Sequence, residues 1–184
     1  MRKVAGVLLV AALAVPAGMV AFSPAGAAGG TTCTTSAGAA KFTPPLPILS
    51  SAVKVKAKLT ATGTVGKCVG GGVTSGHTTF TQTSAITPGN CTTLTKPDPK
   101  SKGTIGKLVI TWNTGKTSTA TAFVVKQTKA ITTSTTTGKI TAGLFVGSSI
   151  TGSVTYKVPT GGCSTKPLAT VTYTGAKGAK FIIK

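Results

Sequence analysis

Acidic residues are nearly missing from this sequence. A single Asp+Glu stands against 20 Lys+Arg in 184 residues, and that residue, Asp98, lies between two prolines. A catalytic pair of carboxylates cannot be built, which excludes ordinary glycoside hydrolysis. Asp98 and the one histidine, His77, lie in separate loop-like stretches, whereas a Ser-His-Asp triad needs both in one pocket. We therefore expect a protein that is not an enzyme, with no catalytic residue and with His77 on the surface.

Arginine, aromatic residues and closely spaced cysteines are scarce as well. The one arginine is Arg2, and Phe, Trp and Tyr make up 5% of the chain. Base-edge readout and base stacking depend on these residues, so any binding to nucleic acid is expected to be non-specific and sensitive to salt. No two cysteines have the spacing of a zinc site, so we expect neither a metal nor another cofactor.

The first 27 residues predict a secretory signal peptide. A positive start at Arg2 and Lys3 precedes an apolar run from Val4 to Val15, and small residues end in the A-x-A site Ala25-Gly26-Ala27. A membrane anchor is the alternative, because the uncharged stretch to Phe22 is nearly long enough to span a bilayer. We expect cleavage, a secreted or extracellular protein that could also be associated with the cell wall, and a single domain over residues 28–184. Loss of Arg2 and Lys3 lowers the formal charge from +19 to +17.

Residues 108–126 predict the central hairpin of an all-β domain. Two β-favouring runs flank Asn113-Thr114-Gly115, a typical turn, and the one tryptophan, Trp112, is expected in the core rather than as a platform for sugars. The clearest alternation is Val53 to Leu59, which predicts a strand with Val53, Val55, Ala57 and Leu59 on one face. Residues 63–72 are expected to form a loop, and no segment of the mature chain has helical periodicity.

About eight or nine short strands with Gly/Pro turns predict an antiparallel β-sandwich, immunoglobulin-like in architecture, with a small β-barrel as the alternative. Four cysteines in an exported chain favour two disulfides, with three pairings open. If the first strand and the Val53 strand run in opposite directions, Cys33 and Cys68 share one end. Cys91 then lies roughly 25 Å away at the other end. Because a disulfide needs Cα atoms within about 7 Å, we favour Cys33–Cys68 and Cys91–Cys163.

Several short motifs resemble secreted β-rich proteins of actinobacteria for which no activity is established. They follow the predicted signal peptide and Cys33, and they cover most of the mature chain. They are Phe42-Thr-Pro-Pro-Leu46, Gly66-Lys-Cys68, Cys91-Thr-Thr-Leu94, Ile110-Thr-Trp112 and Gly143-Leu-Phe-Val-Gly147. The resemblance implies export and a disulfide-tied β domain, and it transfers no catalytic residue.

The lysines are the best functional candidates in the sequence. Lys54, Lys56 and Lys58 alternate with the apolar residues of the predicted strand, so they would present a row of charges to an anion. Such lysines also keep strand edges soluble, but solubility alone would be served by mixed charge. We predict a non-enzymatic cationic β-domain that associates with anionic cell-wall polymers or lipid headgroups. The alternatives are a protein- or carbohydrate-binding module that uses the apolar loop 143–147, and a hydrolase with an unrecognised site.

Overall fold

The computed structural model describes residues 29–83, 90–95, 102–129 and 132–184. The predicted signal peptide at residues 1–27 and Asp98 lie outside these residues. Within them the chain forms one sheet of ten strands and one short helix, α1 (Cys91–Thr95). The strands are β1 (Thr31–Leu46), β2 (Lys58–Val69), β3 (Ser75–Gln82), β4 (Thr104–Trp112), β5 (Thr117–Lys129), β6 (Thr133–Lys139), β7 (Ala142–Gly143), β8 (Ser149–Lys157), β9 (Leu168–Gly175) and β10 (Phe181–Ile183).

The sheet closes on itself through its first strand. Neighbouring strands pair antiparallel in the order β1-β2-β3-β4-β5-β6-β8, and β7 pairs with β5. The remaining gap is filled by β9 and β10, which lie end to end. The start of β1 pairs with β10 and its middle with β9, while β8 pairs with both from the other side. The described residues therefore form a closed eight-stranded antiparallel barrel.

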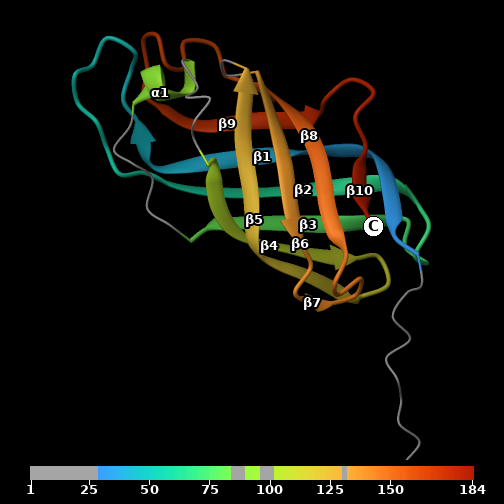
Figure 1. Ribbon diagram of the computed structural model, residues 1–184. Helices are drawn as coiled ribbons and strands as arrows, with labels where there is room; N and C mark the ends of the chain where they lie inside the picture. Colours follow the sequence, from blue (N-terminus) through green and yellow to red (C-terminus); the bar gives the residue numbers. More distant parts are fainter. Residues whose placement is uncertain (1–28, 84–89, 96–101, 130–131) are drawn as a thin grey trace, which may run out of the picture.

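The barrel corrects the sandwich prediction and agrees with its alternative, while the all-β class is confirmed. In Figure 1, β5, β6 and β8 cross in front of β1, β2 and β3 at a steep angle, as two packed sheets would. Hydrogen-bonded strands nevertheless join the two layers at both sides. One join is the β4–β5 hairpin, whose register shifts between Gly106 and Leu108, and the other is the β9–β10 pair. The alternation of residues defines which face of a strand is buried but not which edges pair, so the sequence did not distinguish the two architectures.

The predicted central hairpin is present as β4 and β5. The amide of Trp112 donates to the carbonyl of Lys116 at 2.8 Å, and Gly115 occupies the turn with a φ of 77°. The side chain of Trp112 is buried, and its Nε1 donates to Ser118 Oγ at 2.8 Å. Ser118 Oγ in turn donates to the carbonyl of Leu144 at 2.6 Å. Trp112 is thus a core residue, as expected.

The strand predicted at residues 53–59 begins only at Lys58. Pairing of β2 with β1 stops at Thr43 opposite Lys58, next to Pro44 and Pro45, which have no amide hydrogen to donate to a neighbouring strand. The residues before Lys58 form an irregular segment in which Val53 is 62% exposed and Ala57 is fully buried. The predicted loop at residues 63–72 was also wrong, because β2 continues to Val69.

Both predicted disulfides are confirmed, and they lie at opposite ends of the barrel. Cys33 and Cys68 are directly opposite each other on β1 and β2, at what we call the Trp112 end. Cys91 and Cys163 join α1 to the loop between β8 and β9, at what we call the Cys163 end. There the backbone amide of Leu49 also donates to the carbonyl of Cys163 at 2.8 Å.

Helix α1 has five residues and was not expected from the sequence. It begins after Asn90, whose Oδ1 accepts a hydrogen bond from the amide of Thr92 at 3.0 Å. This is the usual contact of an N-cap residue. The amide of Cys91 donates to the carbonyl of Pro47 at 3.0 Å. The helix therefore anchors the irregular segment that follows β1 to the disulfide at the Cys163 end.

Replacing both Cys91 and Cys163 by alanine should lower the free energy of unfolding by about 4 kcal/mol. The disulfide closes a loop with a sequence separation of 72, and cross-linking a loop of that length removes much of the conformational entropy of the unfolded chain. Urea unfolding followed by Trp112 fluorescence measures the change. Replacing Cys33 and Cys68, with a separation of 35, should cost slightly less. A smaller loss for the Cys91/Cys163 pair than for the Cys33/Cys68 pair would contradict this explanation.

Candidate functional site

The interior of the barrel contains two separate groups of buried apolar residues. One group surrounds Trp112 and includes Phe145, Ile150 and the Cys33–Cys68 disulfide. The other lies at the Cys163 end and includes Leu46, Leu168 and the Cys91–Cys163 disulfide. Each end of the barrel therefore has its own packed group, and the space between them is only partly enclosed.

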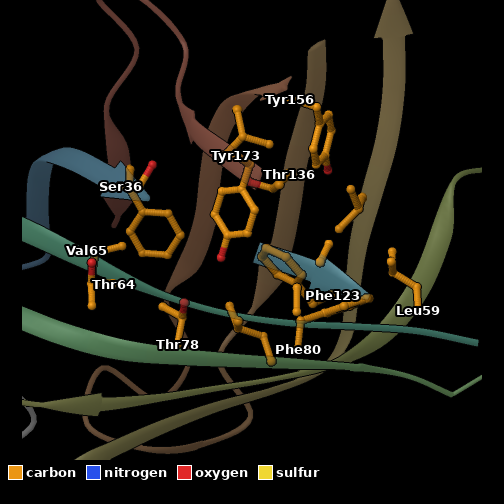
Figure 2. A pocket seen from close by; sticks show the side chains of 16 residues that line it. Ser36, Leu59, Thr64, Val65, Thr78, Phe80, Phe123, Thr136, Tyr156 and Tyr173 are labelled. Atoms are coloured by element: carbon orange, nitrogen blue, oxygen red, sulfur yellow. The ribbon is translucent and has the colours of Figure 1, made fainter. Parts of the chain in front are cut away.

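A cavity occupies the interior between these groups (Figure 2). The cavity has a volume of about 80 Å³. Since a cavity that holds one water needs only roughly 10–15 Å³ of occupied volume, this cavity has room for several waters. Its walls are contributed by every strand that closes the barrel, and among the described residues that line it none is charged. Five aromatic residues stand out in the lining: Phe80, Phe123, Tyr156, Tyr173 and Phe181.

Inward-facing glycines allow Tyr173 to lie against the barrel wall. A Cβ added at Gly38 would lie 2.5 Å from the Tyr173 hydroxyl oxygen, and one added at Gly63 would lie 2.3 Å from it. These two glycines are paired across β1 and β2. Real side chains do not approach so closely, so the tyrosine occupies the space that two missing side chains leave.

The same arrangement recurs around the barrel. The ring of Phe80 lies 2.5 Å from the position of a Cβ at Gly106, and Phe123 lies 2.9 Å from that at Gly138. The Phe80 and Phe123 rings also meet edge to face, with centroids 5.9 Å apart. Because glycines let the large rings rest on the neighbouring strands, the rings line the interior without filling its centre.

The two tyrosines supply the main polar groups of the cavity. Tyr173 donates to the carbonyl of Thr62 at 3.3 Å, and its hydroxyl points toward Thr78, with whose hydroxyl it also hydrogen-bonds (Figure 2). Tyr156 hydrogen-bonds with Ser134, and the two tyrosine rings are 6.2 Å apart in an edge-to-face arrangement. Burial raises the pKa of both tyrosines above 10.0, so both carry neutral hydroxyls at ordinary pH.

The outer surface of the barrel carries lysines separated by threonines. The strand registers place Lys107, Thr81, Thr60 and Lys41 side by side across β4, β3, β2 and β1. Both lysines are exposed, whereas their neighbours along each strand point inward and are buried, as Leu108 is. Two lysines on one such row, three strands apart, are separated by roughly 14 Å at the backbone.

Two further lysines continue this surface on either side of Lys41. Lys58 lies opposite Thr43, two residues from Lys41, so it is a diagonal neighbour about 7–8 Å away. Lys157 of β8 lies opposite Thr172 of β9, again diagonal to the row that contains Lys41. We call the exposed residues Lys41, Lys58, Lys107 and Lys157 the lysine band.

The three lysines proposed from the sequence are exposed, but they do not form a strand ladder. Lys58 is the first residue of β2, while Lys54 and Lys56 belong to the irregular segment at the Cys163 end. The other lysines of the band come from strands distant in sequence. The sequence held no signal for their proximity, because it depends on the registers that close the barrel.

The apolar loop at residues 143–147 turns its largest side chain inward. Phe145 is 4% exposed, and its ring meets that of Trp112 edge to face with centroids 5.6 Å apart. Val146 is 60% exposed, and Val69 at the same end is 77% exposed. Replacing Phe145 would therefore disturb the core, and Val146 is the apolar residue of this loop that a partner can reach.

Of the two residues considered for chemistry, the structure describes His77 but not Asp98. His77 lies on the outer face of β3, exposed between Thr64 and Thr111 of the neighbouring strands. Within the described ranges, no group of three His, Cys, Asp or Glu side chains is placed to hold a metal ion. The cavity was not expected from the sequence. No local pattern indicated it, because the glycines and the rings that rest on them lie on different strands.

Comparison with models of known protein families, with curated proteins and with solved structures finds no match to this chain. In the part of the chain that the structure describes, no helix has the length and apolar character needed to cross a membrane.

Replacing Gly63 by alanine should lower the free energy of unfolding by about 1–3 kcal/mol, the usual cost of overpacking. Its Cβ would lie 2.3 Å from the Tyr173 hydroxyl oxygen and 2.4 Å from the carbonyl oxygen of Ala37, which cannot rotate away. Gly66 on the same strand is the control, because its Cβ would meet only the Thr35 hydroxyl, at 2.9 Å. Urea unfolding compares the two variants, and equal effects would show that the ring does not depend on this glycine.

Alkaline pH should destabilise the protein through its two tyrosines. A pKa raised in the folded state stabilises the fold below the unfolded value of 10.0, and this stabilisation is lost as the pH rises through the folded pKa. The free energy of unfolding should therefore fall above about pH 10. A variant with Tyr156→Phe and Tyr173→Phe should fall less steeply, because it lacks the two hydroxyls whose pKa burial raises. Identical pH profiles for the two proteins would contradict the prediction.

Proposed function

We propose that this protein is an extracellular, non-enzymatic binding domain that associates through its lysines with anionic polymers or surfaces of the cell envelope. The observation that supports the proposal is the lysine band, which is exposed on four strands of the barrel. None of the described residues is Asp or Glu, so the described side chains offer the band no carboxylate. A surface evolved for solubility alone would mix both charges.

The spacing of the band suits a linear polyanion. Neighbouring lysines are about 7 to 14 Å apart by the strand geometry, a range close to the Debye length of about 8 Å at physiological ionic strength. A chain of phosphates or carboxylates can reach several of them at once, and added salt should weaken each contact. Threonine hydroxyls between the lysines offer uncharged hydrogen bonds to the same polymer.

Nucleic acid fits this surface less well. Among the described residues no aromatic side chain is fully exposed, so the surface lacks the stacking platforms that single-stranded nucleic acid uses. The one arginine of the chain, Arg2, lies in the predicted signal peptide. Binding to nucleic acid is therefore expected to be electrostatic and non-specific.

A second candidate function is a protein- or carbohydrate-binding module at the Trp112 end. The exposed Val146 and Val69 support it, and their loops touch, since a Cβ at Gly71 would lie 2.4 Å from the ring of Phe145. Two exposed valines form a small apolar surface, so this candidate ranks below the lysine band.

Neutralising the lysine band should release the protein from anionic surfaces. A variant with Lys41, Lys58, Lys107 and Lys157 changed to glutamine should bind purified cell walls at least about 100-fold more weakly. This expectation follows because each lysine near an anionic surface contributes about 1 kcal/mol to the binding free energy. Co-sedimentation at rising salt measures the loss, and wild-type retention should itself fall with salt. Vesicles with and without phosphatidylglycerol show whether lipid headgroups replace wall polymers.

The matched control changes four exposed lysines outside the band, Lys116, Lys139, Lys177 and Lys180, to glutamine and removes the same charge. It should lose much less binding. Equal losses in the two variants would mean that binding depends only on net charge. Wild-type binding that does not change with salt concentration would contradict the proposal. A Val146→Ser variant that loses binding while the band variant retains it would favour the second candidate.

A further inference from the structure

We propose that the cavity inside the barrel binds a small uncharged aromatic molecule that carries one hydrogen-bonding group. This site is independent of the lysine band, which lies on the opposite face of the same strands. Inward and outward residues alternate along each strand. Lys107, for example, points out where Leu108 lines the cavity.

The lining determines the charge of the ligand. No lysine is among the described residues that form the cavity walls, although the chain is rich in lysine. A charged ligand would lose its hydration and gain no counter-charge, which is strongly unfavourable. A neutral, mainly apolar molecule loses little on entering such a site.

The aromatic residues determine its shape. Five of the chain's nine Phe, Trp and Tyr residues line this one cavity, among them both tyrosines. Aromatic rings favour edge-to-face and offset contacts with other rings, and the Tyr156–Tyr173 and Phe80–Phe123 pairs already meet in this way. A single aromatic ring bound in the cavity would make the same kinds of contact with the Tyr156–Tyr173 pair and with the Phe80–Phe123 pair.

The tyrosine and threonine hydroxyls determine where a polar group of the ligand would lie. Tyr173 and Thr78 hydrogen-bond with each other, and Thr136 also lines the cavity. A hydroxyl both donates and accepts hydrogen bonds. One hydroxyl or carbonyl on the ligand can therefore join the Tyr173–Thr78 pair, while the rest of the molecule contacts carbon.

The construction of the walls indicates that the space is maintained. A void in an apolar core normally costs stability, and a larger residue in place of Ala40 or Ala61 would fill this one. Instead, Tyr173 rests on Gly38 and Gly63 and Phe80 rests on Gly106. These contacts hold the rings at the periphery, so the cavity does not close by a simple rotation of its side chains.

Phenol is the first probe, with benzene as the analogue that lacks the hydroxyl and benzoate as the charged analogue. Both tyrosines line the cavity, but phenol has the same chromophore as tyrosine, so binding is measured by heat rather than by fluorescence. Isothermal titration calorimetry on the full folded domain gives the affinities. We expect saturable binding of phenol, weaker binding of benzene, and binding of benzoate at least about 10-fold weaker than that of phenol.

Three variants test the location. Ala61→Leu fills the cavity and should weaken phenol binding at least about 10-fold, whereas Thr62→Val, its outward-facing neighbour on β2, should not. Tyr173→Phe keeps the ring and should weaken phenol more than benzene. Circular dichroism establishes that each variant is folded, and Ala40→Val replaces Ala61→Leu if the latter is not. Absence of saturable phenol and benzene binding at millimolar concentration, or equal phenol binding by the filled variant, would overturn the proposal.

Discussion

The pairing of β1 with two different strands is the constraint on which the rest of this structure depends. Its first residues bind β10 and its middle binds β9, while β8 completes both contacts. Without these hydrogen bonds the sheet would have two open edges, and its inward face would lose the enclosure that two separate core groups and a cavity require. Closure also places the two disulfides at opposite ends: Cys33–Cys68 joins two strands that already pair, whereas Cys91–Cys163 fixes connections outside the strands.

Closure gives the two faces of the sheet different chemistry. Inside the barrel, aromatic rings from one strand pack directly against glycines of another strand, so the bulky side chains line the walls and leave the centre open. Outside, threonines and lysines alternate with these residues and meet water. The barrel therefore separates an uncharged interior from a cationic exterior by the thickness of one strand. A small neutral molecule and a large polyanion could be bound at the same time, because neither needs the other's residues.

Much of the fold could be predicted from the sequence, and the errors share a cause. The β4–β5 hairpin, the burial of Trp112, both disulfide pairings and the exposed His77 depend on local patterns or on strand direction, and all were expected. The strand predicted from Val53, the loop predicted at residues 63–72 and the sandwich depend on which edges meet. Strand β2 continues to Val69 because β1 pairs with it along the whole length of β2. No residue near Val69 in the sequence indicates that β1 is its neighbour.

The sequence by itself determined the all-β class, the positive charge and the scarcity of carboxylates and histidines that could serve as catalytic acids or bases. Composition and alternation are properties of a chain before it folds. Only the tertiary structure decided that the sheet closes, that Lys41, Lys58, Lys107 and Lys157 share one surface, and that a cavity remains between aromatic rings. Each of these depends on registers between strands far apart in sequence. A shift of one residue in any of them would exchange the inner and outer faces of a strand, and no local pattern specifies such a register.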